Sequence, residues 1–211
     1  MKKKFTITIL GEQCVGKTSI SLIYQEKRFN IQPFFHCSIL DSYQKVKFPD
    51  DDNKYTFKIF DCPGQERYRS IANSTIQIAD GFLMIFSVYN METFRKIVNW
   101  IKFINKSVDF KQKVVFLIGN KADKDERVVK KEEAEEYAKK MDIKYRETSV
   151  KTGEGINEVF QEIFNDIYKN YKYGLIKYGL ISKNKKNNLN LKLLYSNLED
   201  KLNILNKFIS Y

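Results

Sequence analysis

The chain contains very little histidine and cysteine, which removes several kinds of site from consideration. His36 is the only histidine among 211 residues, so acid–base catalysis by histidine is not expected. Cysteine occurs three times, at positions without the spacing of zinc ligands or of a disulfide framework: Cys14, Cys37 and Cys62. This usage favours a reduced, cytoplasmic setting.

Long apolar runs are missing as well. No window approaches the roughly 18 consecutive apolar residues of a membrane-spanning helix, and the charged start of the chain does not look like a secretory signal. Basic residues are in excess and give a formal net charge of +11. They are not interleaved with stacking aromatics in a recognised module, so we expect no nucleic acid partner.

Residues 11–18 (GEQCVGKT) predict a phosphate-binding loop, because two glycines enclose four residues and Lys-Thr follows. Residues 5–10 before the loop alternate like a strand, and residues 19–27 after it are typical of a helix. Backbone N–H groups and the dipole at such a helix N-terminus bind phosphate oxygens. The residues assigned to nucleotide binding in this stretch are Gly11, Gln13, Cys14, Val15, Gly16, Lys17, Thr18 and Ser19.

Each residue type in this loop has a chemical role in such motifs. Gly16 would let the backbone approach the phosphates closely, and Lys17 would reach the β- and γ-phosphates as part of the catalytic machinery. The Thr18 hydroxyl would ligate Mg²⁺. Cys14 occupies a position that glycine would adopt more freely, so we expect an unusual backbone angle there. It is also a candidate reactive thiol near the phosphates.

The second motif, residues 61–65 (DCPGQ), follows a predicted strand at residues 54–60. Asp61 therefore lies at the carboxyl end of a strand, where open α/β sheets bind their ligands. There it would hold Mg²⁺ through water. Gly64 would offer its N–H to the γ-phosphate, and Gln65 would orient the attacking water.

The third motif, NKAD, supplies Asn120, Lys121 and Asp123 after an apolar strand at residues 114–118. A carboxylate there can accept hydrogen bonds from N1–H and the N2 amino group of guanine. Adenine lacks this donor pair, so it would leave a buried carboxylate unpaired. Taken alone, Asp123 would be interpreted as a solvated loop acid. With residues 147–151 (ETSVK) as a fourth motif, the set predicts a site for GTP and GDP.

These four motifs resemble those of the Ras superfamily of small GTPases, and within it the Rab family, over about residues 4–171. The stretch RYRSI from Arg67 is similar to the one that follows the glutamine in Rab proteins. The resemblance implies that Phe29 packs against the base. It also implies a base-binding loop formed by Ser149, Val150 and Lys151, in which Val150 would speed nucleotide release.

The resemblance further implies a switch that engages an exchange factor, a GTPase-activating protein and effectors. They would bind from Ser38 to Tyr43, at Phe60 and from Arg67 to Ile76. Tyr43, Phe60 and Ile76 would form an apolar patch there, or would instead be partly buried in the domain. Ser38 is expected at the place of a magnesium-binding threonine of the first switch, although counting forward from Phe29 would place His36 there.

Another departure bears on hydrolysis. Gln13 stands where many relatives have glycine or serine. Its side chain would either crowd the space beside the γ-phosphate or extend into solvent. We therefore expect a slow GTPase in vesicle trafficking, with two alternatives: a nucleotide-stabilised scaffold that barely hydrolyses, or a soluble transport-type GTPase without lipid.

Alternating strands and helices predict an α/β fold with a doubly wound, mainly parallel sheet. The resemblance adds six strands, one of them antiparallel at the edge, and helices on both faces. An acidic turn at residues 49–53 predicts a hairpin, and residues 91–106, 130–140 and 155–171 predict helices.

The predicted domains are a GTPase domain at 1–171, a basic linker at 172–190 and an amphipathic helix at 191–211. The tail helix is predicted from apolar residues at spacings of three or four: Leu191, Leu194, Leu198, Leu202, Leu205 and Ile209. It would pack on protein or lie on a membrane. No cysteine follows Cys62, so a prenyl anchor at the printed C-terminus is not expected and a peripheral location on endomembranes would need another anchor.

Overall fold

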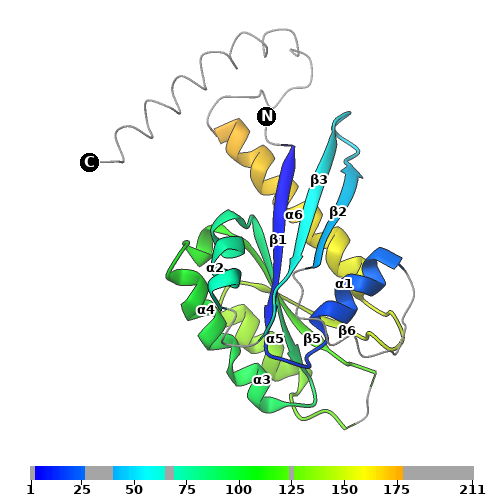
Figure 1. The fold of residues 1–211 in the computed structure, drawn as a ribbon, viewed down its shortest axis with the longest axis vertical. Helices are drawn as coiled ribbons and strands as arrows, with labels where there is room; N and C mark the ends of the chain where they lie inside the picture. Colours follow the sequence, from blue (N-terminus) through cyan, green and yellow to red (C-terminus); the bar gives the residue numbers. More distant parts are fainter. Residues whose placement is uncertain (1–2, 27–39, 65–68, 124–125, 178–211) are drawn as a thin grey trace. The chain divides into compact units, whose positions relative to one another are not determined.

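Six strands form one sheet in the order β2-β3-β1-β4-β5-β6 (Figure 1). This computed structural model describes residues 3–26, 40–64, 69–123 and 126–177. β2 and β3 pair in antiparallel register across the predicted hairpin, whereas the other neighbouring strands of the sheet are parallel. The predicted α/β class is therefore confirmed. The strands are β1 (Lys4–Gly11), β2 (Leu40–Lys47), β3 (Lys54–Asp61), β4 (Gly81–Ser87), β5 (Val114–Asn120) and β6 (Lys144–Thr148).

Helices cover both faces of this sheet (Figure 1). α1 and α6 lie on one face, where Tyr24 stacks on Phe160 with ring centroids 3.9 Å apart and Phe57 stacks on Phe164 at 4.3 Å. α2, α3, α4 and α5 contribute to the core on the other face. The helices are α1 (Lys17–Glu26), α2 (Arg69–Ile78), α3 (Met91–Arg95), α4 (Ile97–Asn105), α5 (Lys131–Lys140) and α6 (Ile156–Lys177), with a short 3-10 helix η2 (Phe110–Gln112).

β4 occupies the centre of the core. Phe82, Met84 and Phe86 belong to the cluster under α2 to α5. Leu83 and Ile85 point to the opposite face, because side chains alternate along a strand. All seven residues of β4 are buried, as expected for a parallel strand covered on both faces.

The region predicted as one helix at residues 91–106 is two helices. α3 ends at Arg95 and α4 begins at Ile97, with Lys96 forming the cap of both. The N–H of Lys96 contacts both the Glu92 and Phe94 carbonyl oxygens, so the turn tightens locally. Apolar periodicity continues through this junction and therefore did not reveal the break.

The chain divides into two compact units, Met1–Ile167 and Tyr168–Tyr211. The second unit is described only through Lys177, where α6 ends. This end lies beyond Tyr171, so the first residues of the predicted linker are helical. Gly174 weakens a helix by about 1 kcal/mol but does not terminate it. The rest of the linker and the predicted tail helix lie outside the described residues.

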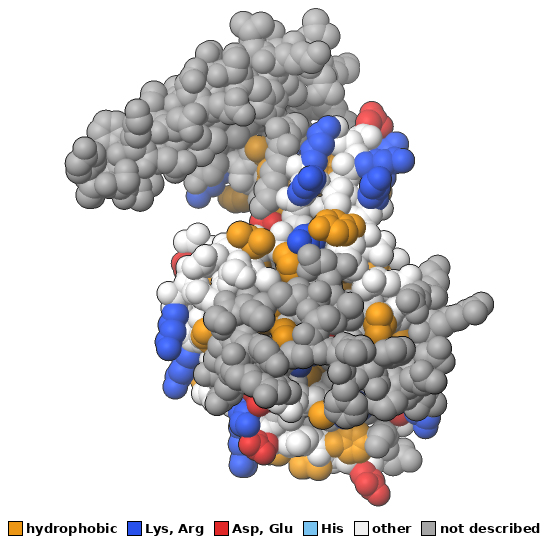
Figure 2. Space-filling view, in the orientation of Figure 1, with side chains coloured by type: hydrophobic (Ala, Val, Ile, Leu, Met, Phe, Trp, Pro, Cys, Tyr) orange, Lys and Arg blue, Asp and Glu red, His pale blue; other side chains and the backbone are white. Residues whose placement is uncertain are grey.

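The outer surface of the β2–β3 hairpin is basic. Lys45, Lys47 and Lys54 are exposed there, and Figure 2 shows basic side chains in blue over this end of the sheet. Lys54 and Lys58 share the face opposite Phe57, because the side-chain direction alternates along β3. Within the described ranges, no helix combines the length and apolar character needed to cross a membrane.

Candidate nucleotide site

The parallel strands bring the four sequence motifs to one edge of the sheet. Asp61 pairs in register with Ile9, two residues before the phosphate loop begins. Asn120 at the end of β5 pairs with Thr148 at the end of β6. The motifs therefore meet at the carboxyl ends of their strands, the position where open α/β sheets bind ligands.

The phosphate loop connects β1 to α1 through an unusual backbone. Cys14 has φ of 60° and Gly16 has φ of 98°, so the unusual angle predicted for Cys14 is confirmed. Cys14 is exposed. A Cβ on Gly16 would collide with the side-chain amide of Asn120. That amide donates to the Val15 carbonyl oxygen at 2.7 Å, which ties the loop to the NKAD motif.

Lys17 turns back across the loop from the first residue of α1. Its side chain is buried, and Nζ donates to the Glu12 carbonyl oxygen at 2.6 Å. Burial lowers the pKa of Lys17, and the negative charges of Asp61 and Glu12 partly oppose this effect. The ammonium group is thus held among acceptors at the mouth of the loop, in position to meet an anion.

Thr18 and Asp61 form the candidate metal position. The Thr18 hydroxyl donates to Asp61 Oδ2. Asp61 Oδ1 is buried and has no hydrogen-bond partner among the described residues. Burial raises the pKa of Asp61 to about 6, although the Thr18 hydrogen bond and the Lys17 charge act in the opposite direction. A hard cation such as Mg²⁺ would satisfy the unpaired oxygen, so these residues fit that ion.

A second unpaired carboxylate oxygen marks the candidate base position. Asp123 Oδ1 accepts from the Ser149 hydroxyl at 2.7 Å, which fixes the carboxylate. Asp123 Oδ2 is buried without a partner among the described residues. The amide of Asn120 is also fixed, since its Oδ1 accepts from Thr148 Oγ1 at 3.1 Å. A buried oxygen without a donor is costly, so the arrangement fits a ligand that presents N–H groups.

The other predicted site residues are only partly covered by the structure. Ser19 lies in the first turn of α1 and Gly11 at the end of β1. Val150 lies close to Gly16: a Cβ there would be 3.7 Å from Val150 Cγ2. Lys151 is exposed. Three predicted site residues lie outside the described residues: Phe29, Ser38 and Gln65.

Gly64 lies directly against the phosphate loop. A Cβ at this position would be 2.6 Å from the Gly11 carbonyl oxygen and 2.7 Å from Lys17 Nζ. Only glycine fits so close to the loop. Gly64 and Lys17 are therefore adjacent.

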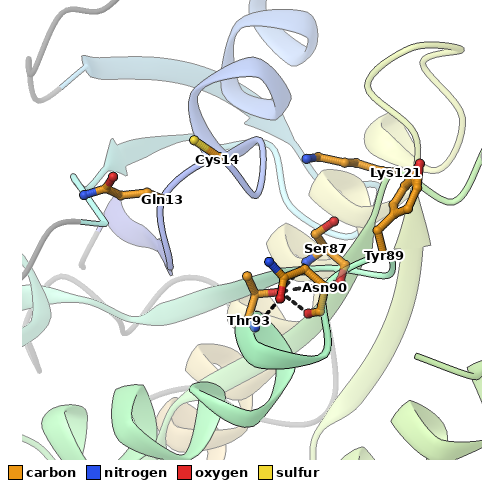
Figure 3. A pocket seen from close by; sticks show the side chains of 7 residues that line it. All are labelled: Gln13, Cys14, Ser87, Tyr89, Asn90, Thr93 and Lys121. Atoms are coloured by element: carbon orange, nitrogen blue, oxygen red, sulfur yellow. Dashed lines mark hydrogen bonds between the residues drawn. The ribbon is translucent and has the colours of Figure 1, made fainter. Parts of the chain in front are cut away.

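Gln13 is exposed and lines two cavities beside the loop. One, of about 320 Å³, is lined by Cys14, Tyr89, Asn90 and Lys121 among others. Figure 3 shows the Gln13 side chain pointing away from Lys121. The other cavity, of about 370 Å³, lies between Gln13, Gly64 and the start of α3.

Comparison with known proteins identifies the family to which the chain belongs. A family model described as Ras family matches residues 6–169. The chain belongs to the Ras family of small GTPases. This GTPase is 33% identical over 161 residues to Ras-related protein Rab-21 of Mus musculus, covering 75% of this chain and 71% of that protein. It is 32% identical to Ras-related protein Rab-18-B of Danio rerio, covering 76% of this chain and 78% of that protein.

The match establishes a small GTPase of the Ras superfamily that is most similar to Rab proteins. GTPase activity, guanine-nucleotide binding and Mg²⁺ are general properties of this family. The resemblance predicted from the four motifs is therefore confirmed.

One predicted surface of this Ras-family GTPase is wrong. Ile76 is fully buried on α2 and Phe60 is 7% exposed, so the two cannot form an apolar patch with Tyr43. Lys58 Nζ lies 4.0 Å from the centroid of the Phe60 ring, and the ammonium group covers it. Tyr43 alone is exposed, at 61%. The alternative, burial in the domain, holds for Phe60 and Ile76.

A support of the base-binding loop was also not recognised in the sequence. Glu147 accepts from Arg127 Nη2 at 2.5 Å and from the Tyr145 hydroxyl at 2.7 Å. Burial opposes ionisation of Glu147, but these donors outweigh it and lower its pKa. The glutamate of the ETSVK motif was visible in the sequence. Its partner Arg127 belongs to no motif, so the sequence did not indicate that the two side chains meet.

Magnesium binding by this GTPase is expected to weaken as the pH falls through about 6. The folded-state pKa of Asp61 is raised, so a proton competes with the metal below that value and is absent well above it. About tenfold more Mg²⁺ should be needed at pH 5 than at pH 7.5 to slow release of fluorescent GDP.

The terminal phosphate of GDP can titrate in the same pH range, so the variant Asp61→Asn serves as the reference. It should bind Mg²⁺ weakly at both pH values and show a smaller change between them. An identical pH dependence in parent and variant would contradict a role for Asp61.

Proposed function

We propose that this Ras-family protein is a Rab-like regulatory switch that binds GTP and GDP with Mg²⁺ and hydrolyses GTP slowly. The observation that carries the proposal is a pair of buried carboxylate oxygens at the same edge of the sheet, one on Asp61 and one on Asp123, that have no hydrogen-bond partner among the described residues. A protein does not leave such groups unpaired without cost, and a Mg²⁺–guanine nucleotide would supply a partner for each.

The division of roles follows from where each group lies. Asp123, fixed by Ser149, would accept from the guanine N–H groups and exclude adenine. Lys17 and the loop N–H groups would bind the phosphates. Thr18, Asp61 and Ser38 would hold Mg²⁺, which neutralises phosphate charge when bound. Gln65 would orient the attacking water, and Gly64 would report the γ-phosphate to the second switch.

The biological role proposed is vesicle trafficking, by analogy with the Rab relatives. Partners would be an exchange factor, a GTPase-activating protein and effectors at the two switches, with exposed Tyr43 as a contact. Association with endomembranes would be peripheral, assisted by the predicted helix at 191–211. Loss of the γ-phosphate would relax the switch loops and release effectors.

A second candidate is a nucleotide-stabilised scaffold with little hydrolysis. Gln13 favours it, because this residue lines the same cavity as Gly64, next to the expected position of Gln65. An amide side chain there can exclude the in-line water or a partner's arginine.

Two measurements test the proposal. Nucleotide released from purified protein should chromatograph as GDP or GTP and not as adenine nucleotides.

In a single-turnover assay, Gln13→Gly should hydrolyse GTP several-fold faster than the parent, because the crowding amide is removed. Gln65→Leu should lower the rate by roughly 10²-fold without loss of binding. A parent rate equal to that of Gln65→Leu would instead support the scaffold.

A further inference from the structure

The side chain of Glu12 attaches the phosphate loop to the α3–α4 segment. Trp100 Nε1 donates to Glu12 Oε1 at 3.1 Å, and Lys96 Nζ lies 3.2 Å from Oε2. Each carboxylate oxygen thus has its own donor. The Glu12 side chain is 20% exposed and Trp100 is 4% exposed, which limits competition from water for the Trp100 hydrogen bond. Lys96 is 41% exposed and also pairs with Glu92 at 3.0 Å, so its contact is the weaker of the two. Hydrogen bonds to an ionised, shielded acceptor are among the stronger ones in proteins.

The main chain of the same residue contacts Lys17 and Gly64, the two residues proposed to bind the γ-phosphate. Its carbonyl oxygen accepts from Lys17 Nζ at 2.6 Å. Gly64 lies so close that a Cβ would be 2.6 Å from the Glu12 carbonyl carbon. The side chain of Glu12 therefore contacts α4 through Trp100, and its backbone contacts both Lys17 and Gly64. A displacement of Glu12 would move the anchor point of Lys17 and the surface against which Gly64 packs.

The loop also needs support from outside because of its own conformation. Cys14 has φ of 60° and carries a side chain, and such a residue costs on the order of 1 kcal/mol where glycine would not. Strained backbone persists only where neighbouring structure fixes it. Hydrogen bonds from neighbouring structure fix the loop on two sides. Asn120 donates to Val15 on one side, and Trp100 and Lys96 donate to Glu12 on the other.

We propose that Glu12 is a positioning residue for the nucleotide phosphates, whose carboxylate, held by Trp100 and Lys96, fixes the loop around the β-phosphate. The inference rests on the proposed nucleotide binding. It predicts a selective effect: ligands that carry a β-phosphate depend on Glu12, whereas GMP, which has none, does not. A merely structural contribution would weaken the binding of GTP, GDP and GMP alike.

The test uses the full chain and the near-isosteric variant Glu12→Gln. The amide keeps the shape of the carboxylate but loses the charge and places an NH₂ group against one of the two donors. Release of fluorescent GDP should become about tenfold faster. The affinity for GMP, measured by competition at millimolar concentration, should stay within twofold of the parent value.

Further variants test whether the effect comes from the hydrogen bonds of the Glu12 carboxylate or from a general destabilisation of the domain. Trp100→Phe removes the indole N–H and should speed GDP release by less than Glu12→Gln. The double variant should be no faster than Glu12→Gln alone, because both changes break one network. The control is Glu136→Gln, which removes a 2.8 Å ion pair with Lys140 on α5 and should release GDP like the parent.

Three outcomes would overturn the inference. GDP release from Glu12→Gln at the parent rate would show that the anchor has no effect on the phosphates. Equal losses for GMP and GDP would show a general structural role. A parent protein that binds no guanine nucleotide would remove the proposed function itself, and that result is visible before any variant is measured.

Discussion

Replacing Asp123 by Asn is expected to move the base preference of this GTPase from guanine to xanthine. The carboxylate is held by Ser149 and presents one buried oxygen that has no partner in the described part of the chain, which suits two N–H donors. An amide presents one acceptor and one donor, which matches N1–H and the C2 carbonyl of xanthine. GDP affinity should fall by about 10³-fold, because a donor would face a donor in a buried site.

Competition of GDP, XDP and ADP against fluorescent GDP measures this change in the parent, and against fluorescent XDP in the variant. Asp52→Asn is the control, since Asp52 is fully exposed at the hairpin, where Lys47 Nζ lies 3.6 Å from its carboxylate. That variant should keep the parent's preference. Preferential binding of ADP by the parent would contradict both the prediction and the proposed site.

Replacing Lys17 by Met should remove nucleotide binding while leaving the fold intact. The ammonium group is buried, and burial lowers its pKa, so holding this charge costs folding free energy. Methionine fills similar volume without that cost, although the hydrogen bond to Glu12 is lost. The free energy of unfolding of the nucleotide-free protein should change by less than about 1 kcal/mol.

GDP affinity of Lys17→Met should fall by at least about 100-fold, because a charged, shielded hydrogen bond to phosphate is removed. Titration with fluorescent GDP and urea unfolding of the nucleotide-free protein give the two readouts. Lys121→Met is a useful comparison, since Lys121 is only partly buried and lies beside the cavity near Tyr89. A large loss of stability in Lys17→Met would mean that the lysine holds the loop rather than the phosphates.

The order of the motifs was sufficient to place the phosphate loop, Asp61 and Asp123 at one edge of a parallel sheet. The reason is local: each motif directly follows a strand, and parallel strands end on the same side. The angle at Cys14 was also predictable, because the motif requires a backbone conformation there whatever residue occupies it. The β4 core strand was evident from its continuous apolar run.

Other features depend on contacts between residues far apart in the chain. Glu12 meets Lys96 and Trp100, which are 84 and 88 residues away, and nothing in the loop motif indicates that partnership. The burial of Ile76 follows from the packing of α2, while Lys58 shields Phe60. Periodicity and motif spacing report which backbone each segment adopts. Which side chains meet, and which carboxylate oxygens stay unpaired for a ligand, is set by how α2, α4 and the loops pack across the sheet.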